Sequence, residues 1–143
     1  MDEDRRRSIE WDCTRTLTGF INALDAGDYE TMAGLMAENG VWVRPGGDAT
    51  GPAGLLEAMK ERPRDLIIRH VISNVLIEVL DDDNATGITY LTVYRHHGPP
   101  PENGPARLDG AHMVGVSYNR LVRESGAWKI GEKRTCRIFD AQA

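Results

Sequence analysis

Cysteine, aromatic residues and long apolar runs are all scarce in this chain of 143 residues. Its two cysteines, Cys13 and Cys136, lie far apart and form no CxxC pair, so we expect free thiols and a cytoplasmic location. No apolar run approaches the ~18 residues that suggest a membrane span, so we expect no membrane partner. The charged N-terminal residues also lack the apolar core of a signal peptide.

Basic residues are too few for a nucleic-acid-binding surface. The chain has 17 Lys and Arg against 22 Asp and Glu, a formal net charge of −5, whereas phosphate recognition needs a clustered basic face. We therefore expect no nucleic-acid partner. A chain of this length with 41% hydrophobic residues is long enough to bury a core, and we expect a single domain over residues 1–143.

Patterns that would indicate a metal, a nucleotide or a covalent nucleophile are missing as well. His96, His97 and His112 form no HxH or HxxxH pattern, and adjacent histidines in a strand point to opposite faces. Gly46 and Gly47 are not followed by the Lys-Ser/Thr pair of a phosphate loop. No serine or cysteine lies in a nucleophile-elbow pattern. We expect neither a metal nor a cofactor.

The first half of the chain carries helical patterns. Apolar residues at helical spacing, followed by Gly27, predict a helix over residues 7–26. Asp28 has the residue type of an N-cap for a second helix over residues 29–38, which Asn39 and Gly40 end. A short strand over residues 41–43 and a third helix over residues 52–62 follow.

The second half of the chain is predicted to form strands. Residues 66–80 and 85–96 flank an acidic turn, and residues 110–123 and 127–139 flank a Gly-containing turn. The proline-rich connection over residues 98–105 is incompatible with the interior of a sheet. Helices followed by a strand meander predict an α+β domain, in which helices cover one face of a curved antiparallel sheet and leave a concave pocket.

Asp25 occupies an unfavourable position in the first predicted helix. It lies in the last turn, beside the negative end of the helix dipole, where an acid costs roughly 0.3–1 kcal/mol. It also follows Ile21 by four residues and therefore borders the apolar face of the helix. A carboxylate that faces inward needs a partner, and His70 is our candidate.

His70 shares its predicted strand face with Ile68 and Ile72, so it points toward apolar surroundings. A lone histidine on such a face is more often a core residue than a catalyst, and Asp25 alone also fits a carboxylate that caps a loop. The pair favours catalysis, because a carboxylate bound to one imidazole nitrogen leaves the other nitrogen to take a proton. Sequence spacing does not show whether the two side chains meet.

Four segments in the same order resemble the SnoaL-like branch of the nuclear transport factor 2-like superfamily. These are Ala-Leu-Asp-Ala-Gly-Asp-Tyr-Glu at residues 23–30, Gly-Val-Trp at 40–42, Arg-His-Val-Ile-Ser-Asn-Val at 69–75 and the segment at 120–130. The resemblance implies a cystatin-like α+β barrel. In that fold a cone-shaped curved sheet, mixed or antiparallel, is closed by three N-terminal helices around a pocket.

The same resemblance implies a catalytic Asp–His dyad. In scytalone dehydratase-like and lindane dehydrochlorinase-like members, the Asp at the end of the first helix matches Asp25, and the His on the first long strand matches His70. There the His removes a carbon-bound proton and the Asp orients the ring, without metal or cofactor. Phe20 replaces a pocket lysine and Leu24 replaces a tyrosine of these enzymes, so the reaction class is better supported than the substrate.

Five further residues are predicted to bind substrate: Trp42, Leu91, Val93, Arg95 and Thr135. Trp42 fits either the pocket wall or the core. By the resemblance, the strand face of Leu91, Val93 and Arg95 points into the cone, and Thr135 lines it from the last strand. Arg95 either binds a carboxylate or enolate oxygen or is an exposed strand-end arginine.

We therefore expect a cofactor-independent lyase or isomerase, dehydratase- or cyclase-like, that acts on a small hydrophobic molecule of cyclic or polyketide-like type. The alternative is a non-catalytic ligand-binding or structural subunit that resembles the β subunit of ring-hydroxylating dioxygenases. A ketosteroid isomerase-like mechanism ranks lower, because it needs a pocket Tyr and a second acid. By the resemblance we also expect a homodimer or homotrimer through the outer sheet face, with Val71, Val75, Ile77 and Val79 on it.

Overall fold

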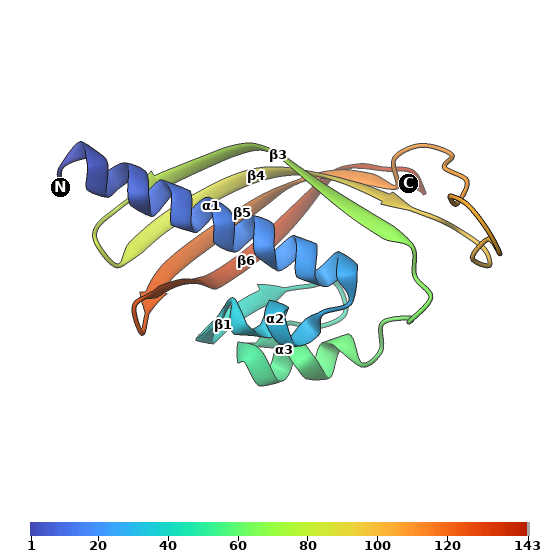
Figure 1. Cartoon of the computed structure of the whole chain (residues 1–143), viewed down its shortest axis with the longest axis horizontal. Coiled ribbons are helices and arrows are strands. Elements are labelled where there is room, and N and C mark those ends of the chain that lie inside the picture. Colours follow the sequence, from blue (N-terminus) through green and yellow to red (C-terminus); the bar gives the residue numbers. More distant parts are fainter. Residues whose placement is uncertain (143) are drawn as a thin grey trace.

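The computed structural model describes residues 1–142 and has the predicted α+β architecture, with three helices around a curved six-stranded sheet. The first helix, α1 (Glu3–Ala26), crosses the sheet, while α2 (Tyr29–Gly34) and α3 (Gly51–Met59) lie beside the short strand β1 (Figure 1). No helix within residues 1–142 is long and apolar enough to cross a membrane.

Helix α1 begins four residues earlier than predicted and ends where predicted. Asp2 caps it by accepting a hydrogen bond from the Arg5 backbone N–H at 2.8 Å, and acidic residues in the first turn suit the positive end of the dipole. Gly27 terminates the helix in the left-handed conformation, with φ of 71°.

The prediction that the second helix reaches residue 38 is wrong. Helix α2 ends at Gly34, and β1 runs over Met36–Val43, because this segment pairs in parallel with the last strand through Met36 and Ile130. Gly40 lies inside the strand rather than at a helix end. A Cβ at Gly40 would lie 2.5 Å from the Ile130 carbonyl oxygen, so close strand approach requires glycine there.

The sheet is mixed and open. Its strands are β1, β2 (Ala49–Thr50), β3 (Ile68–Val79), β4 (Asn84–Arg95), β5 (Met113–Glu124) and β6 (Ala127–Asp140), in the order β2-β1-β6-β5-β4-β3. Among the strand pairings of residues 1–142, β1 with β6 is parallel and the others are antiparallel. The four long strands lie within a few residues of their predicted ranges.

The apolar interior is divided into a large and a small cluster. The large cluster lies between α1 and the inner face of the sheet and includes Phe20, Leu17 and Ile130. The small cluster joins Ile68, Leu91, Val93 and Met113 on three neighbouring strands. Both cysteines are free thiols, Cys13 buried and Cys136 exposed. Burial raises the pKa of the Cys13 thiol to about 12, so this thiol is unreactive.

A β-bulge in β3 exchanges the two faces of the strand. Asn74 has φ of 50°, and the register shifts between Ser73 and Leu76. The predicted common outer face is therefore wrong. Val71 and Val75 are exposed, whereas Val79 is buried and Ile77 packs against the large core cluster.

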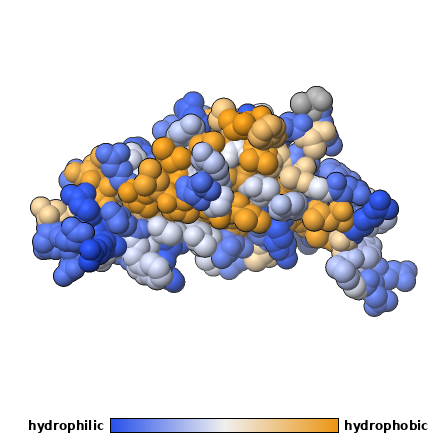
Figure 2. All heavy atoms as spheres, turned by 90° about the horizontal axis from the view of Figure 1, so that it is seen from above, coloured by the Kyte–Doolittle hydropathy of each residue, from blue (hydrophilic) through white to orange (hydrophobic). Residues whose placement is uncertain are grey.

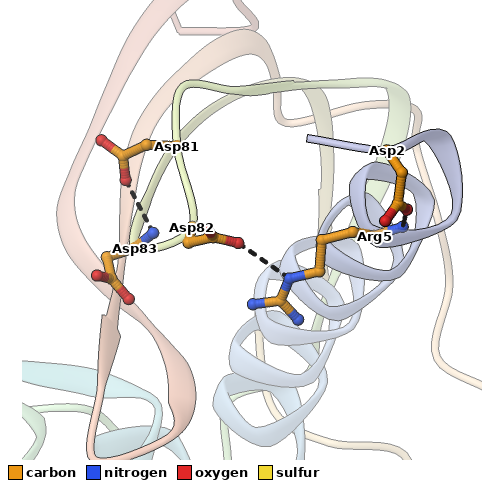
Figure 3. A network of polar contacts seen from close by, with 5 residues as sticks. All are labelled: Asp2, Arg5, Asp81, Asp82 and Asp83. Atoms are coloured by element: carbon orange, nitrogen blue, oxygen red, sulfur yellow. Dashed lines mark hydrogen bonds and ion pairs between the residues drawn. The ribbon is translucent and has the colours of Figure 1, made fainter.

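The N-terminal end of α1 contacts the turn between β3 and β4. Arg5 Nε lies 3.0 Å from Asp82 Oδ1, and Asp81 accepts a hydrogen bond from the Asp83 backbone N–H at 2.8 Å (Figure 3). Because the ion pair is exposed, it contributes only about 0–1 kcal/mol. The helix is held on the sheet mainly by its buried apolar face.

Candidate active site

A cavity of about 280 Å³ opens among β1, β3, β4, β5 and β6. His70 lines it, together with all five residues that the sequence predicted to bind substrate: Trp42, Leu91, Val93, Arg95 and Thr135. The small apolar cluster forms part of its wall, through residues such as Ile68 and Met113. The site is therefore a largely apolar pocket with a few polar groups, as small-molecule sites usually are.

Asp25 and His70 are in contact. His70 Nδ1 lies 2.5 Å from Asp25 Oδ1, and the His70 backbone N–H donates to Asp25 Oδ2 at 2.7 Å. The His70 side chain is only 12% exposed and the Asp25 side chain only 8%. With Nδ1 as the donor, the Asp25 carboxylate holds the ring in the tautomer whose Nε2 is a free base.

The local structure explains why Asp25 is tolerated at the end of α1. Its carboxylate receives both hydrogen bonds from a neighbouring strand, which offset its unfavourable position relative to the helix dipole. Gly27 ends the helix two residues after Asp25, so Asp25 lies in the last turn, where its carboxylate reaches β3. The helix end and the strand are thereby joined at His70.

The surroundings of His70 favour its neutral form. Burial lowers the pKa of His70 below its ordinary value of 6.5, the nearby Arg62 and Lys133 charges act in the same direction, and the Asp25 carboxylate opposes them. The pKa remains lowered on balance. His70 is therefore an uncharged imidazole at neutral pH, able to accept a proton.

Trp42 belongs to both the pocket wall and the core. It lines the cavity, and its ring meets Phe20 edge to face, with centroids 5.6 Å apart and an interplanar angle of 84°. Arg44 also lies over the Trp42 ring, with its guanidinium carbon 5.0 Å from the centroid. Both alternatives for Trp42 are thus realised at once.

A buried polar cluster behind the pocket escaped the sequence analysis. Lys133 is 3% exposed and donates to Ser117 Oγ at 2.9 Å and Asn119 Oδ1 at 3.3 Å. Thr135 Oγ1 in turn lies 3.4 Å from Ser117 Oγ, so a chain of contacts joins Lys133 to the cavity wall. Thr89 Oγ1 is buried without a hydrogen-bond partner among the described residues.

The position of Lys133 depends on a second β-bulge. The register between β5 and β6 shifts after the Leu121–Ile130 pair, and the next pair is Arg120 with Glu132. Gly131 is therefore an extra residue, and the alternation of faces reverses beyond it. Simple alternation from Ile130 would have placed Lys133 on the outer face.

The three histidines considered for a metal take different roles. The two ring nitrogens of His96 lie 3.1 Å from the Arg107 and Pro99 carbonyl oxygens. His97 and His112 face each other with ring centroids 5.4 Å apart, and His112 lines the cavity. Across residues 1–142, no three His, Cys, Asp or Glu side chains cluster in a way that would hold a metal ion.

Solved structures share this fold at low sequence identity. A putative scytalone dehydratase from Novosphingobium aromaticivorans superimposes with a TM-score of 0.81 at 16% identity, over 99% of this chain and 92% of that chain. The hexachlorocyclohexane dehydrochlorinase LinA-type3 from Novosphingobium barchaimii gives 0.79 at 16% identity, over 98% and 93%. An NTF2-like protein with a cystatin-like fold from Novosphingobium aromaticivorans gives 0.76 at 20%, over 96% and 88%.

The sequence comparisons agree with the fold. No curated protein sequence matches this chain. The family model of the SnoaL-like domain matches residues 5–134, a segment that contains the dyad, Lys133 with its two hydrogen-bond acceptors and most of the cavity wall. The cystatin-like cone predicted from the resemblance is thus confirmed, and the chain belongs to the SnoaL-like domain family.

Proposed function

We propose that this protein is a cofactor-independent lyase or isomerase, of dehydratase or cyclase type, in which His70 is the general base and Asp25 orients it. The observation that carries the proposal is the enclosed Asp25–His70 contact at the edge of an apolar cavity. Two of the structures with the same fold bear the names dehydratase and dehydrochlorinase, which are both names of elimination reactions.

The proposed chemistry begins with proton transfer to His70 Nε2. This nitrogen forms no hydrogen bond to any group within residues 1–142, whereas Nδ1 is bound to Asp25. The substrate C–H bond breaks, the N–H bond forms, and the electron pair left on carbon forms a new double bond. In an elimination the leaving group departs with its own bonding pair and takes the proton back from His70. A positioned base of this kind contributes about 10²–10⁴-fold to the rate.

The proposed substrate is a small, mostly hydrophobic molecule of cyclic or polyketide-like type. The support is the apolar lining of the cavity by Leu91, Val93 and Met113, together with the flat Trp42 ring. Aromatic and aliphatic walls bind ring systems by burial of apolar surface.

The test is proton abstraction itself. We would incubate the protein in deuterium oxide with a panel of cyclic and polyketide-like ketones and follow α-hydrogen exchange and elimination by NMR. We expect the substitution His70→Gln to reduce the rate by at least about 10²-fold and Asp25→Asn to reduce it less. The matched controls His97→Gln and Asp12→Asn, both exposed residues, should retain the wild-type rate. Full activity in both dyad variants would refute the proposal.

The exposed apolar outer face of the sheet suits two alternatives, an interface between copies of this chain and the docking face of a subunit in a larger assembly. The outer sheet face exposes large apolar side chains, including Leu76, Ile88, Tyr90, Tyr118 and Phe139, and apolar atoms gather in a band on the face seen in Figure 2. Exposed apolar patches of this kind usually mark interfaces. We propose a cytoplasmic homodimer or homotrimer formed through this face. Light scattering after size-exclusion chromatography would measure the mass, and a stable homo-oligomer without a larger partner would argue against the subunit role.

A further inference from the structure

The side chains that line the cavity and carry a formal charge at neutral pH are arginines. Among the residues that line it are Arg44, Arg95 and Arg137, together with His70 and His112, and no Asp or Glu. This is notable in a chain whose acidic residues outnumber its basic ones by 22 to 17. The pocket therefore has a positive rim in a protein of negative net charge.

Two arginines that line the cavity, Arg44 and Arg95, and a third whose charge acts on His70, Arg62, lack an acidic partner among the described residues. Within residues 1–142, Arg44, Arg62 and Arg95 form no ion pair, and none of their guanidinium groups donates a hydrogen bond to a protein atom. The Arg44 guanidinium lies over the Trp42 ring, and Arg62 Nη2 is buried without a hydrogen-bond partner in the described part of the chain. Buried or half-buried guanidinium groups are normally paired, because an unpaired charge loses its hydration without compensation.

The three guanidinium groups also act on one another. Burial lowers the pKa of Arg62, and the charges of Arg95 and Arg44 add to that effect. The opposing groups are Tyr29 and Asp25. Asp25 is already bound to His70, so it is not free to neutralise the arginines.

Arg137 differs from these three. Its Nη1 lies 2.5 Å from Asp140 Oδ2, so its charge is already matched by a carboxylate. Of the two cavity-lining arginines without an acidic partner, Arg44 is stacked on Trp42. Arg95 is thus the side chain with the most donors left for a ligand.

We propose that the cavity binds its substrate as an anion, an organic carboxylate with an apolar body, whose carboxylate is received by Arg95 with Arg44 as a supporting charge. This inference deepens the proposed function, since it names the substrate class of the same site. A guanidinium binds a carboxylate through two parallel hydrogen bonds, which fix orientation as well as position.

The strand register shows what such an anchor would do. Arg95 pairs with Ile68, and Val93 pairs with His70. Along β4, Arg95 therefore lies two residues from the residue that is paired with the proposed base. Two residues along a strand span about 7 Å. A carboxylate held by Arg95 would therefore leave the carbon atoms a few bonds away from it beside the His70 imidazole.

The experiment measures binding of three carboxylates, benzoate, cinnamate and 1-naphthoate, each against its neutral primary amide, by calorimetry at low salt and pH 7. For at least one pair we expect the carboxylate to bind about 10- to 100-fold more tightly, which is the usual worth of a charge-assisted hydrogen bond. The Arg95→Gln variant should lose this preference. Arg123→Gln removes an exposed strand arginine outside the cavity and should keep it.

The inference is overturned if no carboxylate binds more tightly than its amide, including the case in which neither binds. It is also overturned if Arg95→Gln retains the preference. The His70→Gln variant separates this result from the proposed function, because anion binding should survive in it while turnover is lost. Turnover unaffected by dyad substitutions would refute the proposed chemistry but leave the anion site standing.

Discussion

Asp25 binds His70 through both carboxylate oxygens, one to the imidazole Nδ1 at 2.5 Å and the other to the backbone N–H at 2.7 Å. The first contact sets the tautomer and orientation of the ring. The second ties the C-terminal end of α1 to β3 at the same residue. The same carboxylate therefore orients the base and holds the end of the helix on the sheet. Substitutions at Asp25 should affect both the orientation of His70 and the packing of α1.

The first prediction concerns the pKa of His70 in the Asp25→Asn variant. Burial lowers this pKa, and the Asp25 carboxylate partly offsets the effect by stabilising the protonated ring. Without the carboxylate the pKa of His70 should fall further below 6.5. NMR titration of the imidazole carbon-bound protons measures it directly. An unchanged or raised value would show that Asp25 does not act on the ring.

The second prediction concerns the pH dependence of activity. The folded pKa of His70 is below its ordinary value of 6.5, so the base remains neutral, and active, below pH 6.5. Stability is linked to the same group. Between the folded pKa and 6.5 the unfolded chain binds more protons than the folded chain. The contribution of His70 to the free energy of unfolding is therefore complete above pH 6.5 and is lost as the pH falls through the folded pKa. The acid limb of kcat/KM should therefore lie below pH 6.5, and a limb above 7 would contradict this.

The third prediction concerns Lys133, whose pKa burial lowers to about 8. Between pH 8 and its unfolded pKa of 10.5 the unfolded chain binds more protons, so the wild-type protein gains stability as pH rises. Relative to Lys133→Met, the gain from pH 8 to 9.5 should be on the order of 1–2 kcal/mol. Urea unfolding of both proteins across this range measures it, and parallel curves would show that the lysine is not desolvated.

The fourth prediction concerns Gly40. An added methyl group there would lie 2.5 Å from the Ile130 carbonyl oxygen and from the Met36 sulfur, so Gly40→Ala should destabilise the fold by about 1–3 kcal/mol. At Gly34 nothing lies within 4 Å of the added atom, and Gly34→Ala should be neutral or slightly stabilising. Thermal unfolding of both variants distinguishes steric conflict from a general effect of replacing glycine.

Much of the site was accessible from local sequence. Helical spacing and Gly27 placed Asp25 in the last turn of α1, and alternation with Ile68 and Ile72 turned His70 inward. Both signals are local, because they depend on residues within one element. The two side chains that form this contact are 45 residues apart in the sequence. Local patterns could therefore suggest the contact but could not show it.

The missed features depend on pairing between distant strands. The extra residues at Asn74 and Gly131 reverse the faces of β3 and β6. Because side chains alternate between the two faces of a strand, one inserted residue moves each later side chain to the opposite face. That reversal buries Lys133 and moves Ile77 and Val79 into the core. The conversion of residues 36–38 from predicted helix to strand has the same origin, because pairing with β6 overrides local helical preference.

By itself, therefore, the sequence determined the α+β class, the order of the elements and two inward-facing titratable residues, since these follow from short-range periodicity and chain breakers. Only the tertiary structure decided that Asp25 and His70 touch, that Lys133 is buried and that Arg44 and Arg95 line the cavity without an acidic partner within residues 1–142. The physical reason is that burial, charge pairing and strand register are properties of residues far apart in the chain, which local patterns do not encode.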